Sequence, residues 1–257
     1  MDFKEQLIAL LTIVRKEVGR FMRIWVQTLI PPVINQSLYF IIFGAFIGSQ
    51  IKPINGVSYM SFIVPGLVMM AVITSSFSNV VSSFFGAKFQ RNVEELMVSP
   101  TPNWVILLGF VFGGMLRGIL VGGIVFLVSL IFTPPHVYNI FLIFSFVTLT
   151  AMVFALGGFL NAIFATKFDD VSIFPTFILT PLTYFGGVFY SIQNLPPFWQ
   201  TLSRFNPVLY MVDGFRYGFF GQADVNVNVS LAMLSLSVLV LTLINLYLLK
   251  KGVGLRS

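Results

Sequence analysis

Six apolar stretches, each long enough to cross a lipid bilayer as a helix, constrain this sequence more than any other feature. They lie at about 24–48, 58–83, 105–131, 137–165, 171–190 and 229–249. About 20 consecutive apolar residues span the hydrocarbon core of a bilayer, and in lipid only helices and closed barrels satisfy their own backbone hydrogen bonds. The pattern therefore predicts an all-α polytopic membrane protein with one transmembrane domain over 24–249.

The composition excludes several other classes of protein. Hydrophobic residues make up 57% of the 257 residues and charged residues only 9%, whereas soluble domains are about 45–50% apolar and about 25% charged. The 30 Phe residues exclude a disordered chain, because disordered sequences are poor in apolar residues. The lack of Cys and the single His136 exclude a disulfide framework and most zinc or catalytic-triad chemistry.

The basic residues predict how the chain is oriented in the membrane. They form no long run or stripe, so nucleic acid is not an expected partner. An even number of spans places both termini on one side, and Lys and Arg are enriched on the cytoplasmic side. With the termini inside, the cytoplasmic set is Lys4, Arg15, Lys16, Arg20, Arg23, Lys88, Arg91, Lys167, Lys250, Lys251 and Arg256, and the outer set is Lys52, Arg204 and Arg216. This asymmetry predicts cytoplasmic termini, with 250–257 as a cytoplasmic tail.

The segment before the first span, 1–23, has the pattern of an amphipathic helix. Apolar residues recur at steps of three and four, at Phe3, Leu7, Leu10, Leu11, Val14, Val18, Phe21 and Trp25. Charged residues take the other faces. Such a helix lies in the headgroup plane of a membrane, and the alternative is a water-exposed helix docked on a partner.

The cytoplasmic segment between the second and third spans predicts a short amphipathic helix over about 87–97. Its apolar stripe consists of Phe85, Phe89, Val93, Leu96 and Met97. Arg91 lies three and four residues before Glu94 and Glu95, a spacing that supports a helix. We expect the helix to stop at Ser99, because Pro100 disfavours helix in the residue before it. Such a helix either binds another protein or lies on the lipid surface.

The third span carries a stripe of glycines at Gly109, Gly113, Gly114, Gly118 and Gly122. The GxxxG spacing lets another helix approach closely in lipid. That neighbour either belongs to the same chain or to a second copy of it.

Arg117 lies within this glycine helix and is the one formal charge near the middle of a predicted span. An arginine at that depth costs about 2.5–3.5 kcal/mol on insertion scales, so it faces protein or water or extends to the interface. Its role is either structural or one in substrate passage or gating. The carboxylates that we consider as its partners are Glu94, Glu95, Asp169 and Asp170.

The outer segment 191–228 is too aromatic for a solvated loop and too interrupted by proline for a span. It predicts short interfacial or re-entrant helices on the outer side, because non-helical backbone at membrane depth must be shielded. Asp213 and Arg216, three residues apart, either pair with each other or form an outer gate.

Three threonines of the fifth span, Thr176, Thr180 and Thr183, present hydroxyls on one helical face. They either line a transport path or make hydrogen bonds to another helix.

Several motifs are absent from the sequence. It contains no GxxxxGK[ST] phosphate loop and no HExxH or other metal-binding spacing. No predicted span has Asp, Glu or His near its middle, as proton-coupled transport usually requires. Active transport by this chain would therefore be driven from outside it, most simply by a nucleotide-binding subunit. A secondary transporter or channel is the alternative, and a membrane-embedded lipid enzyme would need an acid–base or nucleophilic cluster that the sequence lacks.

Two stretches resemble a known family. Residues 84–102 read FFGAKFQRNVEELMVSPTP, and 181–221 contain a glycine-rich span end, Leu-Pro-Pro, a Trp, Asn-Pro and an Arg. Both are similar to the corresponding segments of ABC-2-type transporter permeases, and the likeness covers nearly the whole chain.

The resemblance implies a homodimeric six-helix permease of the bacterial inner membrane that exports a substrate not named by the sequence. It implies a separate cytoplasmic ABC ATPase that uses ATP and Mg²⁺, so the chain itself is not an enzyme and binds no cofactor. In the family, the segment matching 87–96 is a coupling helix seated in the ATPase, the residues before Trp25 form a connecting helix, and the region matching 195–221 caps the exit. The residues thereby assigned to ATPase coupling are Lys88, Phe89, Arg91, Glu94 and Glu95.

Overall fold

A computed structural model describes residues 1–54 and 56–254 of the chain. Most of these residues are helical, and the extended pairing found among them is a single bridge between Ile54 and Val57. The elements are α1 (Phe3–Arg23), α2 (Trp25–Thr28), α3 (Ile30–Tyr39), η1 (Phe40–Ile47), η2 (Gly48–Gln50), α4 (Tyr59–Phe89), α5 (Asn92–Val98), α6 (Asn103–Ser129), α7 (Ile140–Phe164), α8 (Phe168–Phe174), η3 (Pro175–Leu179), α9 (Thr180–Tyr184), η4 (Ile192–Asn194), α10 (Pro197–Arg204), α11 (Pro207–Phe220) and α12 (Val227–Lys251).

Five helical segments are long and apolar enough to cross a membrane. They are Trp25–Ile47, Tyr59–Phe89, Asn103–Ser129, Ile140–Phe164 and Val227–Lys251. They correspond to five of the six predicted spans. The remaining one, predicted at 171–190, consists of the short pieces α8, η3 and α9, which together run only from 168 to 184.

Two prolines explain why this remaining segment is broken into pieces. Pro175 opens η3 and Pro181 lies in the first turn of α9. Each lacks the N–H that would bond to the carbonyl four residues earlier, so the regular α-helical pattern is interrupted at both positions. Between them the backbone adopts the wider π-helical pattern of η3.

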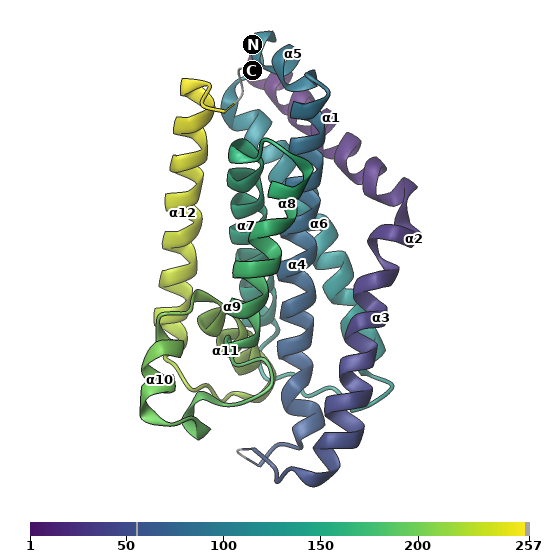
Figure 1. Cartoon of the computed structure of the whole chain (residues 1–257), viewed down its shortest axis with the longest axis vertical. Helices are drawn as coiled ribbons and strands as arrows, with labels where there is room; N and C mark the ends of the chain where they lie inside the picture. Colours follow the sequence, from purple (N-terminus) through teal and green to yellow (C-terminus); the bar gives the residue numbers. More distant parts are fainter. Residues whose placement is uncertain (55, 255–257) are drawn as a thin grey trace.

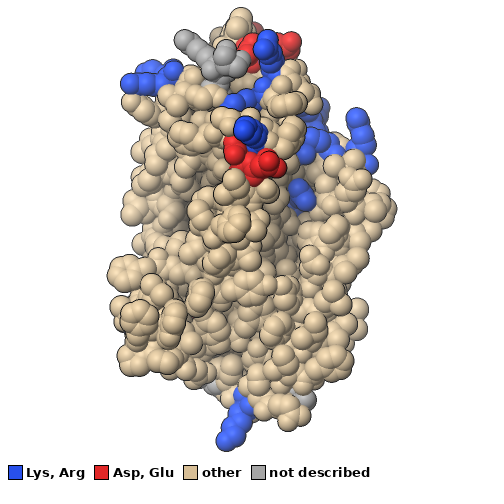
Figure 2. Space-filling view, in the orientation of Figure 1, with Lys and Arg blue, Asp and Glu red and all other residues tan. Residues whose placement is uncertain are grey.

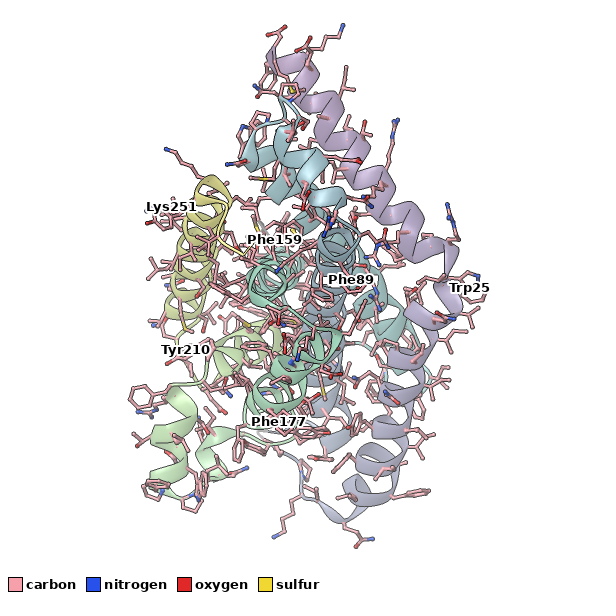
Figure 3. The ribbon with its side chains drawn as sticks, turned by 45° about the horizontal axis from the view of Figure 1, so that its top comes forward. Trp25, Phe89, Phe159, Phe177, Tyr210 and Lys251 are labelled. Carbon is pink, nitrogen blue, oxygen red and sulfur yellow. The ribbon has the colours of Figure 1, made fainter. Side chains whose placement is uncertain are left out.

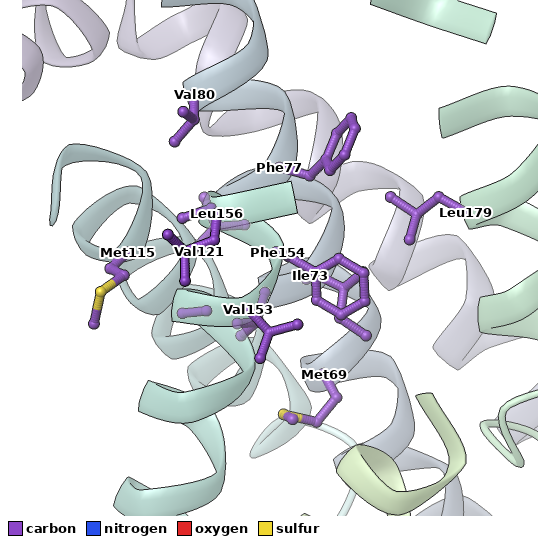
Figure 4. Packing of buried hydrophobic residues seen from close by; sticks show 14 of the residues in the cluster. Met69, Ile73, Phe77, Val80, Met115, Val121, Val153, Phe154, Leu156 and Leu179 are labelled. Atoms are coloured by element: carbon purple, nitrogen blue, oxygen red, sulfur yellow. The ribbon is translucent and has the colours of Figure 1, made fainter. Parts of the chain in front are cut away.

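The helix α4 forms the centre of the molecule, and α12 lies at its edge (Figure 1). In their most apolar windows, 83% of the α4 residues are buried against 11% of those of α12. On two sides α4 packs against α6 and α7. Phe84 of α4 meets Phe110 of α6 edge-on, with 5.2 Å between ring centroids, and lies 4.0 Å from the ring of Phe159 of α7. Figure 4 shows this core at the level of Ile73 and Leu156.

The charged side chains visible in Figure 2 lie toward the ends of the bundle. On the face shown, nearly all of them lie at the end that carries both termini, and a broad uncharged belt separates them from the opposite end. Many large apolar side chains of the bundle are exposed, among them Phe141, Phe144 and Phe177. A surface of this kind suits contact with lipid rather than with water.

The N-terminal helix α1 packs against α6 with a face whose buried residues include only Phe21 of the predicted apolar stripe. Its buried residues are Ile13, Glu17 and Phe21. Phe3 and Leu7 of the predicted stripe are exposed instead. One face of α1 therefore packs within the chain, and a second, apolar face remains at the surface.

The predicted helix over 87–97 was wrong in its extent, because the structure divides it into two helices. The first part belongs to α4, which continues to Phe89. Arg91 then adopts a left-handed conformation with φ of 61°, and α5 begins at Asn92. The end of α5 at Val98, with Ser99 as its C-cap, agrees with the stop expected before Pro100.

The segment 191–228 contains two short helices, α10 and α11, preceded by the single turn η4. Asn206 caps the N-terminus of α11, and Gly221 ends it in the left-handed conformation that glycine adopts readily. Both helices lie away from the end that carries the termini (Figure 1). Of the predicted tail at 250–257, Lys250 and Lys251 form the last turn of α12, and 255–257 lie outside the described residues.

Candidate functional site

A cluster of charged and polar side chains, which we call the inner cluster, lies between α1, α4 and α6, near the end that carries the termini. Two glycines of α6 allow α1 to approach closely enough to form it. A Cβ atom at Gly109 would come within 2.5 Å of Ile13, and one at Gly113 within 2.5 Å of the Glu17 Cβ. Any larger residue at either position would push α1 away from α6.

Glu17 is fully buried in this inner cluster. Its Oε2 atom pairs with Arg20 at 3.3 Å. Arg20 also donates from Nη2 to Oδ1 of Asn79 at 2.8 Å and to the Asn79 carbonyl at 3.0 Å. The Arg20 side chain thus connects α1 to α4. The second Glu17 oxygen, Oε1, has no hydrogen-bond partner among the described residues.

Arg117 of α6 completes the inner cluster. It is 9% exposed and donates from Nη2 to the backbone carbonyl of Thr28 at 3.0 Å. Thr28 ends α2, and the residue four positions later, which would donate to its carbonyl in a continuous helix, is Pro32. Since proline has no N–H, the Arg117 guanidinium supplies a donor that the chain itself lacks at this break.

The carboxylates suggested as partners of Arg117 were the wrong choice. In the described part of the chain, Arg117 makes no ion pair with Glu94, Glu95, Asp169 or Asp170. Asp170 instead accepts hydrogen bonds from the backbone N–H groups of Thr166 and Lys167. This carboxylate closes the first turn of α8 rather than pairing with α6.

The remaining glycines of α6 face α4 of the same chain. A Cβ atom at Gly114 would collide with Val80, one at Gly118 with Ser76, and one at Gly122 would lie 2.5 Å from Val72. The GxxxG spacing left open whether the helix that packs on this stripe belongs to the same chain or to a second copy. Its neighbours are α1 and α4 of the same chain, not a second copy.

The sequence did not reveal Glu17, Asn79 or Thr28 as members of the inner cluster. Glu17 follows Arg15 and Lys16 in a segment rich in charge, which favours an exposed position. The signal that could have identified it is its helical spacing, because Ile13, Glu17 and Phe21 are four residues apart and share one face. The same face carries Arg20.

The residues assigned to ATPase coupling do not form one continuous helical face. Lys88 lies inside α4 and donates to the carbonyls of Ile163 and Ala165, both at 2.7 Å. These carbonyls belong to the C-terminal end of α7, where a cation is favourable. Lys88 therefore joins α4 to α7, and its hydrogen bonds are made within the chain.

The other coupling residues are exposed at the end of α4 and in α5, and Figure 3 labels Phe89 among them. Phe89 is 62% exposed and packs edge-on against Phe168 of α8, with 4.9 Å between ring centroids. Arg91, Glu94 and Glu95 are exposed beside it. We call Phe89, Phe168, Arg91, Glu94 and Glu95 the cytoplasmic surface, after the side of the membrane on which the sequence predicts this end. It combines an aromatic pair with charges of both signs, a composition that suits binding to a protein partner.

A second polar cluster, which we call the outer cluster, joins α11 to the loops around it. The Asp213 Oδ1 atom lies 3.9 Å from Nη1 of Arg216, so the two residues form the ion pair that their spacing suggested. Asp213 also accepts hydrogen bonds from the backbone N–H groups of Asp224 and Val225, at 3.1 and 2.8 Å. Both side chains are buried.

Arg216 and Asp224 extend this outer cluster to the loop after α9. Arg216 donates to the Gly187 carbonyl at 2.7 Å, and its guanidinium lies 3.9 Å from the centroid of the Phe62 ring. Asp224 accepts from Ser191 Oγ at 2.6 Å and from the Ile192 N–H at 3.0 Å. The outer cluster therefore holds two loops and α4 together around α11. Sequence reasoning identified Asp213 and Arg216 but not Asp224.

The three threonines of the fifth predicted span do not share one environment. Thr176 and Thr180 are exposed and Thr183 is buried. The hydroxyl of Thr180 donates to the Pro175 carbonyl at 2.9 Å, and that of Thr183 to the Thr180 carbonyl at 2.8 Å. These two hydroxyls bond to their own helix, so they do not bridge to another helix.

The sequence of this chain is similar to those of known transport proteins. The model of the family described as ABC-2 type transporter matches residues 8–220. The inner membrane transport permease YadH of Escherichia coli (strain K12) is 56% identical over 250 residues, which cover 97% of this chain and 98% of that protein.

More distant relatives extend this comparison. Nodulation protein J of Rhizobium leguminosarum bv. viciae is 22% identical, over 74% of this chain and 73% of its own length. Nodulation protein J of Neorhizobium galegae is 21% identical, over 73% of this chain and 72% of its own length. The family model covers the inner cluster, the cytoplasmic surface, and Asp213 and Arg216 of the outer cluster, but it ends at residue 220, before Asp224 and α12.

Proposed function

The chain belongs to the ABC-2 type transporter family, and we propose that it is the membrane-spanning permease of an ATP-driven exporter. In this proposal a separate cytoplasmic ABC ATPase binds and hydrolyses ATP with Mg²⁺. The chain itself forms the path for the substrate and has no catalytic role. The family match over most of the chain is the observation that carries the proposal.

The cytoplasmic surface supports the assignment of an ATPase partner. It lies at the end that carries both termini and nearly all the charge visible in Figure 2. An exposed Phe89–Phe168 pair beside Arg91, Glu94 and Glu95 offers apolar contact together with charges of both signs. Lys88 has a different role in this proposal, because it fastens α4 to the end of α7 and transmits movement between them.

We also propose that α8, η3 and α9 act as the sixth span, so that both termini are cytoplasmic. The helices α10 and α11 then enter the outer leaflet and return, and the outer cluster holds them over the exit of the path.

Thr176, which makes no hydrogen bond among the described contacts, is the candidate for lining that path. The relative YadH is named as an inner membrane transport permease, and this supports a location of the present chain in the inner membrane. Two copies of the chain form the transporter, through a surface other than the glycine stripe.

The exposed apolar face of α1 supports a location in the membrane interface. Phe3, Leu7 and Leu11 lie on that face, while Glu17 and Arg20 fasten the opposite face to the bundle. The helix would thus rest in lipid on one side and connect to α4 on the other.

The proposal is tested by isolating the complex. The chain is tagged after Ser257, extracted in mild detergent, and assayed for a co-purifying ATPase with vanadate-sensitive ATP hydrolysis. We expect an ATPase in stoichiometric amount. The double variant Arg91→Glu with Glu94→Lys should recover less ATPase while inserting normally into the membrane, whereas Lys52→Glu, far from the cytoplasmic surface, should recover the wild-type amount.

Equal recovery of the ATPase by the wild type and the double variant contradicts the role of the cytoplasmic surface. Isolation of a folded chain without any ATPase, together with uptake into vesicles driven by an ion gradient and without ATP, supports a secondary transporter instead.

A further inference from the structure

A groove of about 650 Å³ opens on the side of the bundle, between α12 on one wall and α8, η3 and α9 on the other. We call it the lateral groove. The helix α7 forms its floor, and Pro207 and Met211 of α11 close one end. Figure 4 labels Phe77, Phe154 and Leu179, which line it. Its volume lies within the range of about 300–1,000 Å³ that is typical of ligand sites.

The dimensions of the lateral groove match one leaflet of a bilayer. On its floor it extends from Val153 to Phe164 along α7, which is about 17 Å of helix at about 1.5 Å per residue. Half of a hydrocarbon core of about 30 Å is about 15 Å. The closed end lies near the middle of α7, and the open end lies where α7 meets Lys88 on the cytoplasmic side. An extended acyl chain of one inner-leaflet lipid fits this length.

Polar groups occur only toward the open end and on one wall. Asn161 lines the groove near its open end, and its Nδ2 atom is buried without a hydrogen-bond partner in the described part of the chain. Ser237 on α12 donates to the carbonyl of Met233 and is satisfied. An unpaired buried amide donor is costly, and a change of the Asn161 rotamer would turn this donor from its enclosed position toward the groove, where a bound ligand accepts its hydrogen bond. The ester carbonyl of a glycerolipid is such an acceptor.

The open end also carries a cation on the face of α12 that forms the wall. Lys251 follows Val240 by about three helical turns and therefore shares its face. Its Nζ atom lies 5.1 Å from the centroid of the Tyr247 ring, and Lys251 forms no ion pair among the described residues. Tyr and Lys at such a position are typical of the membrane interface, where basic side chains bind lipid phosphates. Lys167 on the opposite wall faces Asp170, so it adds little net charge.

We propose that the lateral groove binds one inner-leaflet anionic glycerophospholipid. One acyl chain lies over Gly157 toward Met211, an ester carbonyl accepts from Asn161, and the phosphate faces Lys251. The lipid then fills the space between α12 and α8, and it holds the least buried helix of the bundle in place. This inference does not depend on the ATPase partner.

The full-length chain, with any subunits that co-purify, is reconstituted in nanodiscs of palmitoyl-oleoyl phosphatidylglycerol and phosphatidylcholine. It is then released into detergent, and retained lipids are identified by native mass spectrometry. We expect the wild type to retain phosphatidylglycerol in preference to phosphatidylcholine. Gly157→Leu should lose it, because a Cβ atom there makes only ordinary contact with Phe77, at 3.9 Å, so the leucine side chain fits without a clash and fills part of the groove. Gly123→Leu, on α6 with nothing within 4 Å, is the matched control and should retain it.

A second pair of variants tests the groove from α12 if Gly157→Leu does not fold. Ser237→Leu fills the same space, and the exposed Ser235, two residues earlier on the other side of the helix, provides the control Ser235→Leu. For the headgroup, Lys251→Glu should abolish the preference for phosphatidylglycerol, whereas Lys250→Glu, which changes charge equally on another face, should preserve it.

Three results overturn the proposal. The first is retention of phosphatidylglycerol by Gly157→Leu and Ser237→Leu at the wild-type level. The second is an equal effect of Lys251→Glu and Lys250→Glu. The third is a change from dimer to monomer in the groove variants with no change in bound lipid, which would assign the groove to a second copy of the chain.

Discussion

At the scale of single residues, burial decides what each charge does. Glu17, Arg20 and Arg117 all lie near the end that carries the termini, but Glu17 is fully buried whereas Arg20 keeps 30% of its side chain exposed. Arg117 serves a backbone carbonyl rather than a carboxylate. A buried ion that loses its partner destabilises the fold far more than a surface charge does. The inner cluster is therefore where single substitutions should have their largest effects.

Glu17→Ala should lower the stability of the chain. Loss of one partner from a buried pair costs about 3–5 kcal/mol, and because Arg20 is partly exposed and keeps Asn79 we expect about 2 kcal/mol. The measurement is the melting temperature of the purified chain in detergent. Arg15→Ala, at an exposed position of the same helix, should have little effect. Equal melting temperatures for both variants would contradict the burial of Glu17.

Arg117→Met should destabilise the chain by about 1–3 kcal/mol, because the buried Thr28 carbonyl loses its donor. Pro32→Ala offers a specific rescue, since alanine restores the N–H that a helix would direct to Thr28. We expect Arg117→Met to cost less in the Pro32→Ala background than in the wild type. The same cost in both backgrounds, measured by thermal unfolding, would show that Arg117 acts through another contact.

At the scale of elements, small residues and prolines decide how helices meet. The glycines of α6 serve two neighbours, with Gly109 and Gly113 toward α1 and Gly114, Gly118 and Gly122 toward α4. The prolines at 175 and 181 divide one predicted span into three pieces. Arg91 in a left-handed turn separates α5 from α4. Each of these features changes the direction or the spacing of a helix without changing the hydrophobic pattern around it.

Gly118→Ala should separate α6 from α4. Its Cβ atom would collide with Ser76 Oγ and lie 3.0 Å from the Val72 carbonyl, so the helices must move. Overpacking of this kind costs about 1–3 kcal/mol. Gly123→Ala on the same helix meets nothing within 4 Å and is the control. If the two variants unfold at the same temperature, α4 and α6 are not in the close contact described here.

At the scale of the whole molecule, one central helix and one peripheral helix define the architecture. The central helix α4 contributes to both polar clusters, through Asn79 at one end and Phe62 at the other. Movement of the cytoplasmic surface at the end of α4 would therefore reach the outer cluster along one rigid element. The peripheral helix α12 is held by α7 and α11, with Asn245 donating to the Leu156 carbonyl at 3.1 Å.

The absence of cysteine makes the orientation of the whole molecule directly testable. Lys52→Cys and Val98→Cys introduce single thiols at exposed positions near opposite ends. In intact spheroplasts, a membrane-impermeant maleimide should label Lys52→Cys and should label Val98→Cys only after the membrane is opened. The reverse pattern would place the termini outside.

The sequence predicted part of the outer cluster and the end of α5, but it predicted little of the inner cluster. The pairing of Asp213 with Arg216 and the end of α5 before Pro100 depend on residues only a few positions apart. Asp224 reaches Ser191 across 33 positions, and Arg117 reaches Thr28 across 89. Contacts over such separations depend on how helices are packed, which periodicity does not specify.

The sequence by itself determined that the chain is a helical membrane protein, where its long apolar helices lie, and which family it resembles. It did so because a bilayer demands a fixed length of apolar helix, and that length is a local property of the chain. Only the tertiary structure decided that Glu17 is buried, that Thr28 is the partner of Arg117, and that α12 stands apart from α8 to leave a groove. These features arise where helices distant in sequence approach one another, and the distance of approach is set by side chains on both partners.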